Sequence, residues 1–187
     1  ICGCASQKAS SLFKKDNVYY VAGATNKQSI INHLKDEGFS SDVKDLPTKY
    51  DDAGILSSAN RTRVYVKIQD GCNSFCSYCI IPYLRGRSRS RAIDDIVDEV
   101  SVLATKTSEI VLIGINIMSY GLDIGTNLTE LIKALKDFDV RIRLGSFYAE
   151  GITEELLDAL FSLKKFCPHF HLSLQSGDRQ VLKDMNR

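Results

Sequence analysis

The sequence predicts an α/β protein built from parallel strand–helix units, arranged either as an open sheet or as a barrel. From residue 64 onward, short apolar runs of strand length alternate with longer segments whose apolar residues recur at helical spacing. Such alternation is typical of right-handed parallel βαβ units. In addition, 44% of the 187 residues are hydrophobic, which is enough for a sizeable core.

The first 63 residues predict a separate, smaller unit and a linker. Residues 18–22 form a strand-like apolar run, and Ile30, Ile31 and Leu34 share one helical face before Gly38. Residues 40–63 are polar and show no sustained periodicity, so we expect a linker between two domains there.

The second part, residues 64–187, predicts four strands and four helices. Its expected strands are residues 64–69, 109–115, 141–147 and 169–175. Three helices are predicted by apolar stripes, which are Ile93, Ile96, Val97, Val100, Leu103 and Ala104, then Leu128, Leu131, Ile132 and Leu135, then Leu156, Leu157, Leu160 and Leu163. Thr153 is the expected cap of the third, and a last helix is expected to begin near Asp178.

Composition limits the class of protein. The net charge is +1, so a nucleic-acid partner would have to be bound by a local patch. No apolar run approaches the roughly 18–20 residues of a membrane-spanning helix, and no signal peptide is evident, so we expect no membrane partner and a cytoplasmic location. Because the chain starts at Ile1 and stops inside a predicted helix, we expect a fragment.

Three cysteines directly follow the first strand of the second part. Cys72, Cys76 and Cys79 lie within eight residues. Three thiolates suit an iron–sulfur cluster and leave one iron of a four-iron cluster without a protein ligand. A structural zinc site would need a fourth ligand, and the three histidines of the chain lie elsewhere. Zinc, unligated thiols and, less favoured, a disulfide remain the alternatives.

Polar residues follow the other predicted strands as well. Asn116 follows the second strand, Tyr148 and Glu150 follow the third, and Gln175 follows the fourth. Active sites of parallel β/α barrels are built at the carboxyl ends of the strands, so these residues are candidates for one site. The alternative is that loops are polar wherever they occur.

A basic run follows the cysteines. Its four arginines are Arg85, Arg87, Arg89 and Arg91. Guanidinium groups of this kind contact phosphates, and Tyr83 beside them could stack on a base. The alternative is a solvated loop in front of the next helix.

The three-then-two cysteine spacing, with an aromatic residue before the third cysteine, resembles the radical S-adenosylmethionine (SAM) enzymes and, within them, the methylthiotransferases. The stretch from Arg61 to Cys72, with the basic run Arg85–Arg91, is similar to the branch that modifies threonylcarbamoyladenosine in tRNA. The resemblance extends from Gly3–Gln7 to Leu174–Asp178.

The resemblance implies a domain plan. It implies a partial (β/α) barrel of about six units, of which four are present. Residues 1–39 would be the C-terminal part of an α/β methylthiotransferase domain, residues 40–63 a linker, and residues 64–187 the N-terminal part of the radical SAM core.

The resemblance also implies the cofactors and their ligands. Cys72, Cys76 and Cys79 would hold a [4Fe-4S] cluster whose open iron binds SAM. Tyr78 would line the adenine, and Asn116 and Gln175 would hydrogen-bond SAM. Cys4 would be one ligand of a second [4Fe-4S] cluster in the full-length parent. One departure is Tyr148, which stands where the family has a carboxylate, with Glu150 two residues on.

The implied reaction adds a methylthio group at carbon 2 of N6-threonylcarbamoyladenosine next to the tRNA anticodon, with electrons from an external donor. Two alternatives keep the chemistry and change the substrate to N6-isopentenyladenosine in tRNA or an aspartate of a ribosomal protein. A third alternative, of another class, is a non-catalytic metal-binding module.

Overall fold

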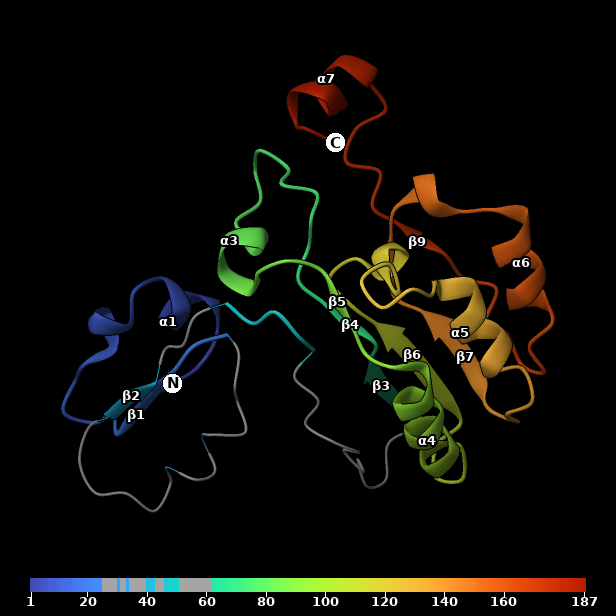
Figure 1. Cartoon of the computed structure of the whole chain (residues 1–187), viewed down its shortest axis with the longest axis horizontal. Coiled ribbons are helices and arrows are strands. Elements are labelled where there is room, and N and C mark those ends of the chain that lie inside the picture. Colours follow the sequence, from blue (N-terminus) through green and yellow to red (C-terminus); the bar gives the residue numbers. More distant parts are fainter. Residues whose placement is uncertain (25–29, 31–32, 34–39, 43–45, 51–61) are drawn as a thin grey trace.

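The computed structural model describes residues 1–24, 30, 33, 40–42, 46–50 and 62–187. Figure 1 shows a small N-terminal group of elements beside a larger sheet that helices cover. Within the described residues, no helix combines the length and apolarity needed to cross a membrane.

The N-terminal group contains two parallel strands. Helix α1 (Cys4–Lys8) and the 3-10 helix η1 (Ser10–Phe13) precede β1 (Tyr20–Ala22), which lies in the predicted strand. β1 pairs with β2 (Ser40–Asp42). The first three residues of the predicted linker, 40–42, therefore belong to the sheet of this group. A three-residue strand shows no periodicity, and its pairing with β1 is what identifies it. The helix predicted between β1 and β2 falls almost wholly outside the described residues.

The larger sheet confirms the predicted parallel α/β class. Strands β3 (Arg63–Lys67), β6 (Glu109–Ile113) and β7 (Arg141–Leu144) pair in parallel in that order. After Gly145 the chain continues as β8 (Ser146–Phe147), which pairs in parallel with β9 (His171–Leu172). The strands therefore lie side by side in chain order, and their carboxyl ends share one edge.

The last strand is shorter than predicted. Residues 169–175 were expected to be extended, but only His171 and Leu172 pair with β8. On either side the backbone makes local bonds, from His169 N to Cys167 O at 2.7 Å and from Ser176 N to Leu174 O at 2.9 Å. Both β9 residues are exposed, and β9 pairs with β8 alone.

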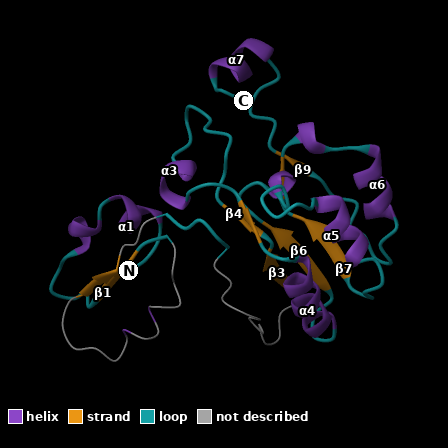
Figure 2. Cartoon of the chain, in the orientation of Figure 1, coloured by secondary structure: helices purple, strands orange, loops and turns teal. Residues whose placement is uncertain are grey.

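Three helices cover one face of the sheet (Figures 1 and 2). They are α4 (Ile93–Ala104), α5 (Leu128–Ala134) and α6 (Glu154–Phe161). The Asn127 side chain accepts a hydrogen bond from Glu130 N at the start of α5, and Thr153 does the same for Leu156 N at α6. Such caps satisfy amides that the first helical turn leaves free. The Thr153 cap was predicted.

The core lies between these helices and the sheet. On β3, Val64 and Val66 are buried against the helices, whereas Tyr65 points to the opposite face and is 59% exposed. Leu131 and Ile132 of α5 are fully buried in the same cluster. The period-two and period-3.6 patterns thus meet in one hydrophobic core.

The connection from β3 to α4 was not predicted in detail. It contains β4 (Gln69–Asp70), α3 (Ile81–Arg85) and β5 (Arg89–Ser90), with β4 and β5 antiparallel. These elements are too short to show a periodicity, although Pro82 in the first turn of α3 is a helix-start signal. This connection carries all three clustered cysteines.

Three short helices complete the described chain. The 3-10 helices are η2 (Ile117–Ser119) and η3 (Ala149–Gly151). Helix α7 (Arg179–Asp184) is capped by Asp178, whose carboxylate accepts hydrogen bonds from Gln180 N and Val181 N. The helix predicted to begin near Asp178 is therefore confirmed.

Candidate metal and cofactor site

Asp70 fixes the base of the cysteine loop. Its carboxylate lies 2.6 Å from Lys67 Nζ, 3.2 Å from Arg85 Nη1 and 3.3 Å from Arg89 Nη2. It also accepts a hydrogen bond from Gly71 N at 2.8 Å. Burial opposes its ionisation, but the Lys67 and Gly71 hydrogen bonds and the nearby positive charges outweigh burial and hold the pKa of this carboxyl below its ordinary value.

Gly71 provides the turn that leads into the cysteines. Its φ is +70°, and a Cβ built at this position would lie 1.9 Å from Arg87 O. A side chain therefore has no room between the two arms of the connection. Cys72 N donates to Gly86 O at 3.1 Å, which joins the arms one residue further on.

The three clustered cysteines are free thiols on one loop. Cys72 and Cys76 are buried, and Cys79 is half-buried. Among the described residues, no three His, Cys, Asp or Glu side chains already stand together as a metal site. The donor set nevertheless fits an iron–sulfur cluster chemically, because residues 71–81 offer three thiols and no imidazole or carboxylate.

The segment after α7 packs against the cysteine loop. Ser77 N donates to Met185 O at 2.9 Å, and Asn186 Nδ2 donates to Phe75 O at 3.1 Å. The guanidinium carbon of Arg187 lies 3.6 Å from the centre of the Tyr148 ring. The first two contacts tie the cysteine loop to residues 185–186.

Tyr148, directly after β8, lies close to the cysteines. Burial and the nearby Cys72 thiol raise the pKa of its hydroxyl, so the group stays neutral. Arg187 also lies near Cys76. The structure therefore places an arginine and a tyrosine beside two predicted ligands.

Asn116 is buried at the end of β6 and is tied to the cysteine loop through Gln69. Gln69 Oε1 accepts from Asn116 N at 2.9 Å, while Gln69 Nε2 donates to Gly71 O at 2.7 Å. Asn116 Nδ2 donates to Ser119 Oγ, but Asn116 Oδ1 is buried without a hydrogen-bond partner. A buried acceptor of this kind fits a ligand that brings a donor, such as a ribose hydroxyl or an ammonium group.

The other two predicted SAM contacts are exposed. Tyr78 is 53% exposed, and its hydroxyl lies near Cys76. Gln175 is exposed beyond β9, with a φ of +68° that is uncommon for a residue other than glycine. Both stand at the carboxyl edge of the sheet, as Asn116 does.

The structure divides the basic run into structural and exposed arginines. Arg89 is buried and paired with Asp70, and Arg91 is buried and paired with Glu99. Arg85 is half-buried between α1 and Asp70, and only Arg87 of the four is exposed. The predicted patch of four guanidinium groups is therefore reduced to one exposed member.

Cys4 lies at the start of α1, apart from the other predicted ligands. Helix α1 contacts α3, where Arg85 lies near the Cys4 thiol and pairs with Asp70. Burial works against the charge of Arg85, but these two partners raise its pKa. Arg85 thus links the N-terminal group to the base of the cysteine loop.

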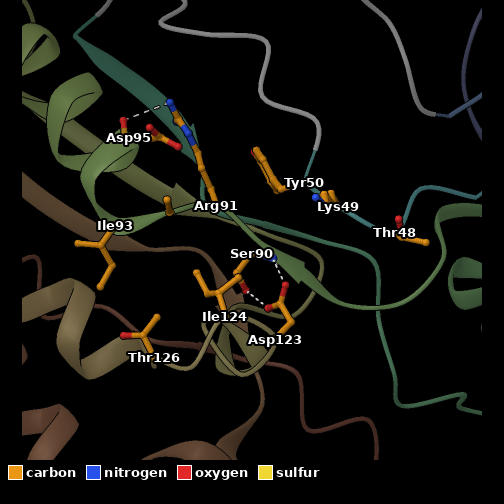
Figure 3. Close-up of a pocket in the computed structure, with 11 residues that line it drawn as sticks. Thr48, Lys49, Tyr50, Ser90, Arg91, Ile93, Asp95, Asp123, Ile124 and Thr126 are labelled. Atoms are coloured by element: carbon orange, nitrogen blue, oxygen red, sulfur yellow. Dashed lines mark hydrogen bonds between the residues drawn. The ribbon is translucent and has the colours of Figure 1, made fainter.

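A cavity of about 750 Å³ lies between residues 48–50 and the start of α4 (Figure 3). Ser90 contributes to its wall, with its amide and hydroxyl both bonded to Asp123, at 2.9 and 2.6 Å. Arg91 is the only predicted site residue in its lining, and none of the cysteines reaches it. The cavity is therefore separate from the cysteine site.

Sequence reasoning missed Gln69, Asp70 and Arg187 as parts of the site. The sequence feature that could have identified Gln69 and Asp70 is their position between an apolar strand and Gly71. Polar residues at the end of a buried strand need hydrogen-bond partners, so they indicate a local polar network. No neighbouring residue in the sequence indicates a role for Arg187, because its contact is with Tyr148, which is distant in the chain.

Comparisons with known proteins identify the family of this chain. Residues 66–187 match the Radical SAM superfamily. The chain is 37% identical to the tRNA-2-methylthio-N(6)-dimethylallyladenosine synthase of Alkaliphilus oremlandii, covering 100% of this chain and 42% of the relative. It is 35% identical to the threonylcarbamoyladenosine tRNA methylthiotransferase of Thermotoga maritima, covering 99% and 44%.

A third relative is the threonylcarbamoyladenosine tRNA methylthiotransferase of Aquifex aeolicus. It is 37% identical, over 99% of this chain and 48% of the relative. The chain thus spans less than half the length of these relatives. A solved radical S-adenosylmethionine methyltransferase from Kitasatospora setae matches with a TM-score of 0.44 and 21% identity, over 52% of this chain and 20% of that chain.

Proposed function

We propose that this chain, which belongs to the radical SAM superfamily, is part of a tRNA methylthiotransferase that modifies carbon 2 of N6-threonylcarbamoyladenosine next to the anticodon. The observation that carries the proposal is the placement of three free thiols at the carboxyl end of the first core strand. Parallel β/α folds build their active sites at that edge. The names of the relatives support the tRNA class of substrate.

Cys72, Cys76 and Cys79 would hold a [4Fe-4S] cluster in this site. Such a cluster supplies the electron that cleaves SAM, and its open iron supplies a position for the methionine part of SAM. The Asp70 ion pairs and the Gly71 turn keep the loop in place at the strand end. Binding would require the three thiols to converge on one cluster.

The chain's own side chains would position SAM and shield it. Asn116 Oδ1 is the buried acceptor available to a SAM hydroxyl or ammonium group. Tyr78 would cover the adenine, and Gln175 would hydrogen-bond from the neighbouring strand end. Tyr148 with Arg187 would close the side of the site next to Cys76.

The full-length parent would carry a second [4Fe-4S] cluster with Cys4 among its ligands. The link from Cys4 through Arg85 to Asp70 supports this, because it joins the N-terminal group to the cysteine loop. The partners of the parent would be tRNA and an external electron donor.

The choice of substrate rests on the residues before the first cysteine. Ile68, Gln69 and Asp70 resemble the threonylcarbamoyladenosine branch. A relative named for dimethylallyladenosine and a relative named for threonylcarbamoyladenosine are each 37% identical to this chain. N6-isopentenyladenosine is therefore the second candidate substrate.

Metal analysis tests the cofactor part of the proposal. After anaerobic reconstitution, about four irons and four sulfides per Cys72–Cys79 site are expected, because each such cluster contains four of each. The electron paramagnetic resonance spectrum of the reduced protein should change on adding SAM. Cys72→Ser should lose this signal, whereas Cys2→Ser, at an exposed thiol, should keep it. Zinc without sulfide would instead identify a structural metal module.

Nucleoside analysis tests the substrate. In cells that lack the parent gene, N6-threonylcarbamoyladenosine should accumulate without its methylthio group, and the gene should restore it. Loss of the methylthio group from isopentenyladenosine alone would select the second candidate. Normal levels of both modified nucleosides would refute the tRNA assignment.

A further inference from the structure

We propose that Phe75, Tyr83 and Arg87, together called the aromatic–arginine patch, dock the anticodon loop of tRNA beside the cysteine loop. This inference rests on the proposed function, which makes a single-stranded RNA loop the substrate. It goes further by assigning RNA contact to three residues and by excluding most of the basic run from that role.

The three side chains lie in contact with one another. The rings of Phe75 and Tyr83 meet edge to face, with centroids 5.3 Å apart and an interplanar angle of 84°. The guanidinium carbon of Arg87 lies 4.4 Å from the centre of the Phe75 ring. Phe75 comes from the cysteine loop and Tyr83 from α3, so the patch joins two segments of the same connection (Figure 1).

The backbone at Phe75 supports a functional reason for this arrangement. Its φ is +48°, a left-handed value that is uncommon for a bulky residue. Asn186 Nδ2 bonds to Phe75 O at 3.1 Å and helps to hold it. Strained residues persist where their surroundings fix them, and they concentrate at binding sites.

The exposed part of the patch has the chemistry of an RNA-binding surface. Tyr83 is 64% exposed and offers a ring for stacking. Arg87 is exposed, and within the described residues it makes no ion pair. The sequence contains no Asp or Glu between Asp70 and Asp94. The one carboxylate of this connection, Asp70, is buried and paired with Lys67, Arg85 and Arg89, so no exposed carboxylate from the connection repels phosphate.

The other three arginines cannot serve in the same way without breaking internal contacts. Arg85 and Arg89 pair with Asp70, and Arg91 pairs with Glu99. The Tyr83 ring can stack on a base, and the Arg87 guanidinium can bind a phosphate. This combination suits single-stranded RNA, which proteins bind through base stacking and backbone contacts. Because Phe75 directly precedes Cys76, a base stacked at the patch would lie next to the proposed cluster site.

Fluorescence anisotropy with a labelled anticodon stem-loop RNA tests the patch in the reconstituted full-length protein. Tyr83→Ala should weaken binding by about 5- to 100-fold, the effect of losing one stacked base. Tyr83→Phe should keep wild-type affinity, and so should Tyr19→Ala, a matched change at a tyrosine that is 71% exposed in the N-terminal group.

The salt dependence of binding tests Arg87 separately. Arg87→Ala should make the slope of log K against log salt shallower by about 0.7, the value of one phosphate contact on single-stranded nucleic acid. Arg87→Lys should keep the slope. Arg91→Ala should lower the melting temperature and leave the slope of the remaining folded protein unchanged, because its partner is Glu99.

Two different failures can be told apart. If the wild-type protein binds no RNA, the proposed tRNA substrate falls and the patch with it. If the wild-type protein binds RNA but Tyr83→Ala and Arg87→Ala bind it equally well, the patch is refuted while the tRNA substrate stands. Equal binding of an acidic peptide and the RNA would indicate a protein partner instead.

Discussion

Replacing Asp70 with Asn should destabilise the protein strongly although the two side chains have nearly the same shape. The amide oxygen can still accept the hydrogen bond from Gly71 N. What is lost is the negative charge that Lys67, Arg85 and Arg89 share. The change therefore isolates the electrostatic role of the carboxylate.

The magnitude depends mainly on Arg89. Its side chain is 3% exposed and that of Asp70 is 6%, so the substitution removes a buried carboxylate from beside a buried guanidinium. Removing one partner of a buried pair costs about 3–5 kcal/mol. Arg89 also donates to the carbonyl oxygens of Arg85 and Arg87, which favours the lower end, about 3 kcal/mol. The half-exposed Lys67 and Arg85 add about 0–1 kcal/mol each.

Thermal unfolding followed by circular dichroism measures the effect. For a protein of this size, a loss of about 3 kcal/mol lowers the melting temperature by roughly 6–12 °C. Asp139→Asn is the matched control, because Asp139 is 72% exposed and pairs with Lys165 on the surface. If Asp70→Asn melts no lower than Asp139→Asn, the charge of Asp70 does not hold the base of the cysteine loop and the electrostatic reasoning is refuted.

Four further predictions follow from single positions. Because the folded pKa of Asp70 lies below 3.8, its contribution to stability is present above about pH 4 and is lost below it, so urea midpoints at pH 7 and pH 3 should differ less in Asp70→Asn than in wild type. Gly71→Ala forces an alanine into a left-handed conformation, at about 1–2 kcal/mol, and against Arg87 O, so iron incorporation should fall while helix content stays. Asn127→Ala removes the cap of α5 and should cost about 1 kcal/mol in urea unfolding, and no loss would contradict the cap. Leu131→Ala leaves a cavity at a fully buried position and should lower the free energy of unfolding by about 2–5 kcal/mol. A loss below about 0.5 kcal/mol, typical of a surface substitution, would contradict the burial of Leu131.

The helices and the parallel class could be predicted because their signals are local. The apolar stripe from Ile93 to Ala104 coincides with α4, and the caps Thr153 and Asp178 mark the starts of α6 and α7. Strand lengths were less predictable. A run such as 169–175 is apolar enough for a strand, but how much of it pairs depends on its neighbour β8.

The candidate site could be predicted in its ligands but not in its support. The three cysteines and Asn116 were identified from spacing and from their place after strands. The sequence could not show that Asn116 Oδ1 is buried without a hydrogen-bond partner. The surroundings of Asn116 include Gln69, which binds its backbone amide from 47 residues away in the sequence.

The sequence by itself determined the thiol spacing, the parallel strand–helix order and the superfamily, because each is written in neighbouring residues. It presented Arg85, Arg87, Arg89 and Arg91 as four equal cations. Only the tertiary structure separated them, by placing Asp70 and Glu99 against three and leaving Arg87 beside Phe75. The physical reason is that the role of a charge depends on its burial and its counter-ion, and both are set by packing between segments distant in the chain.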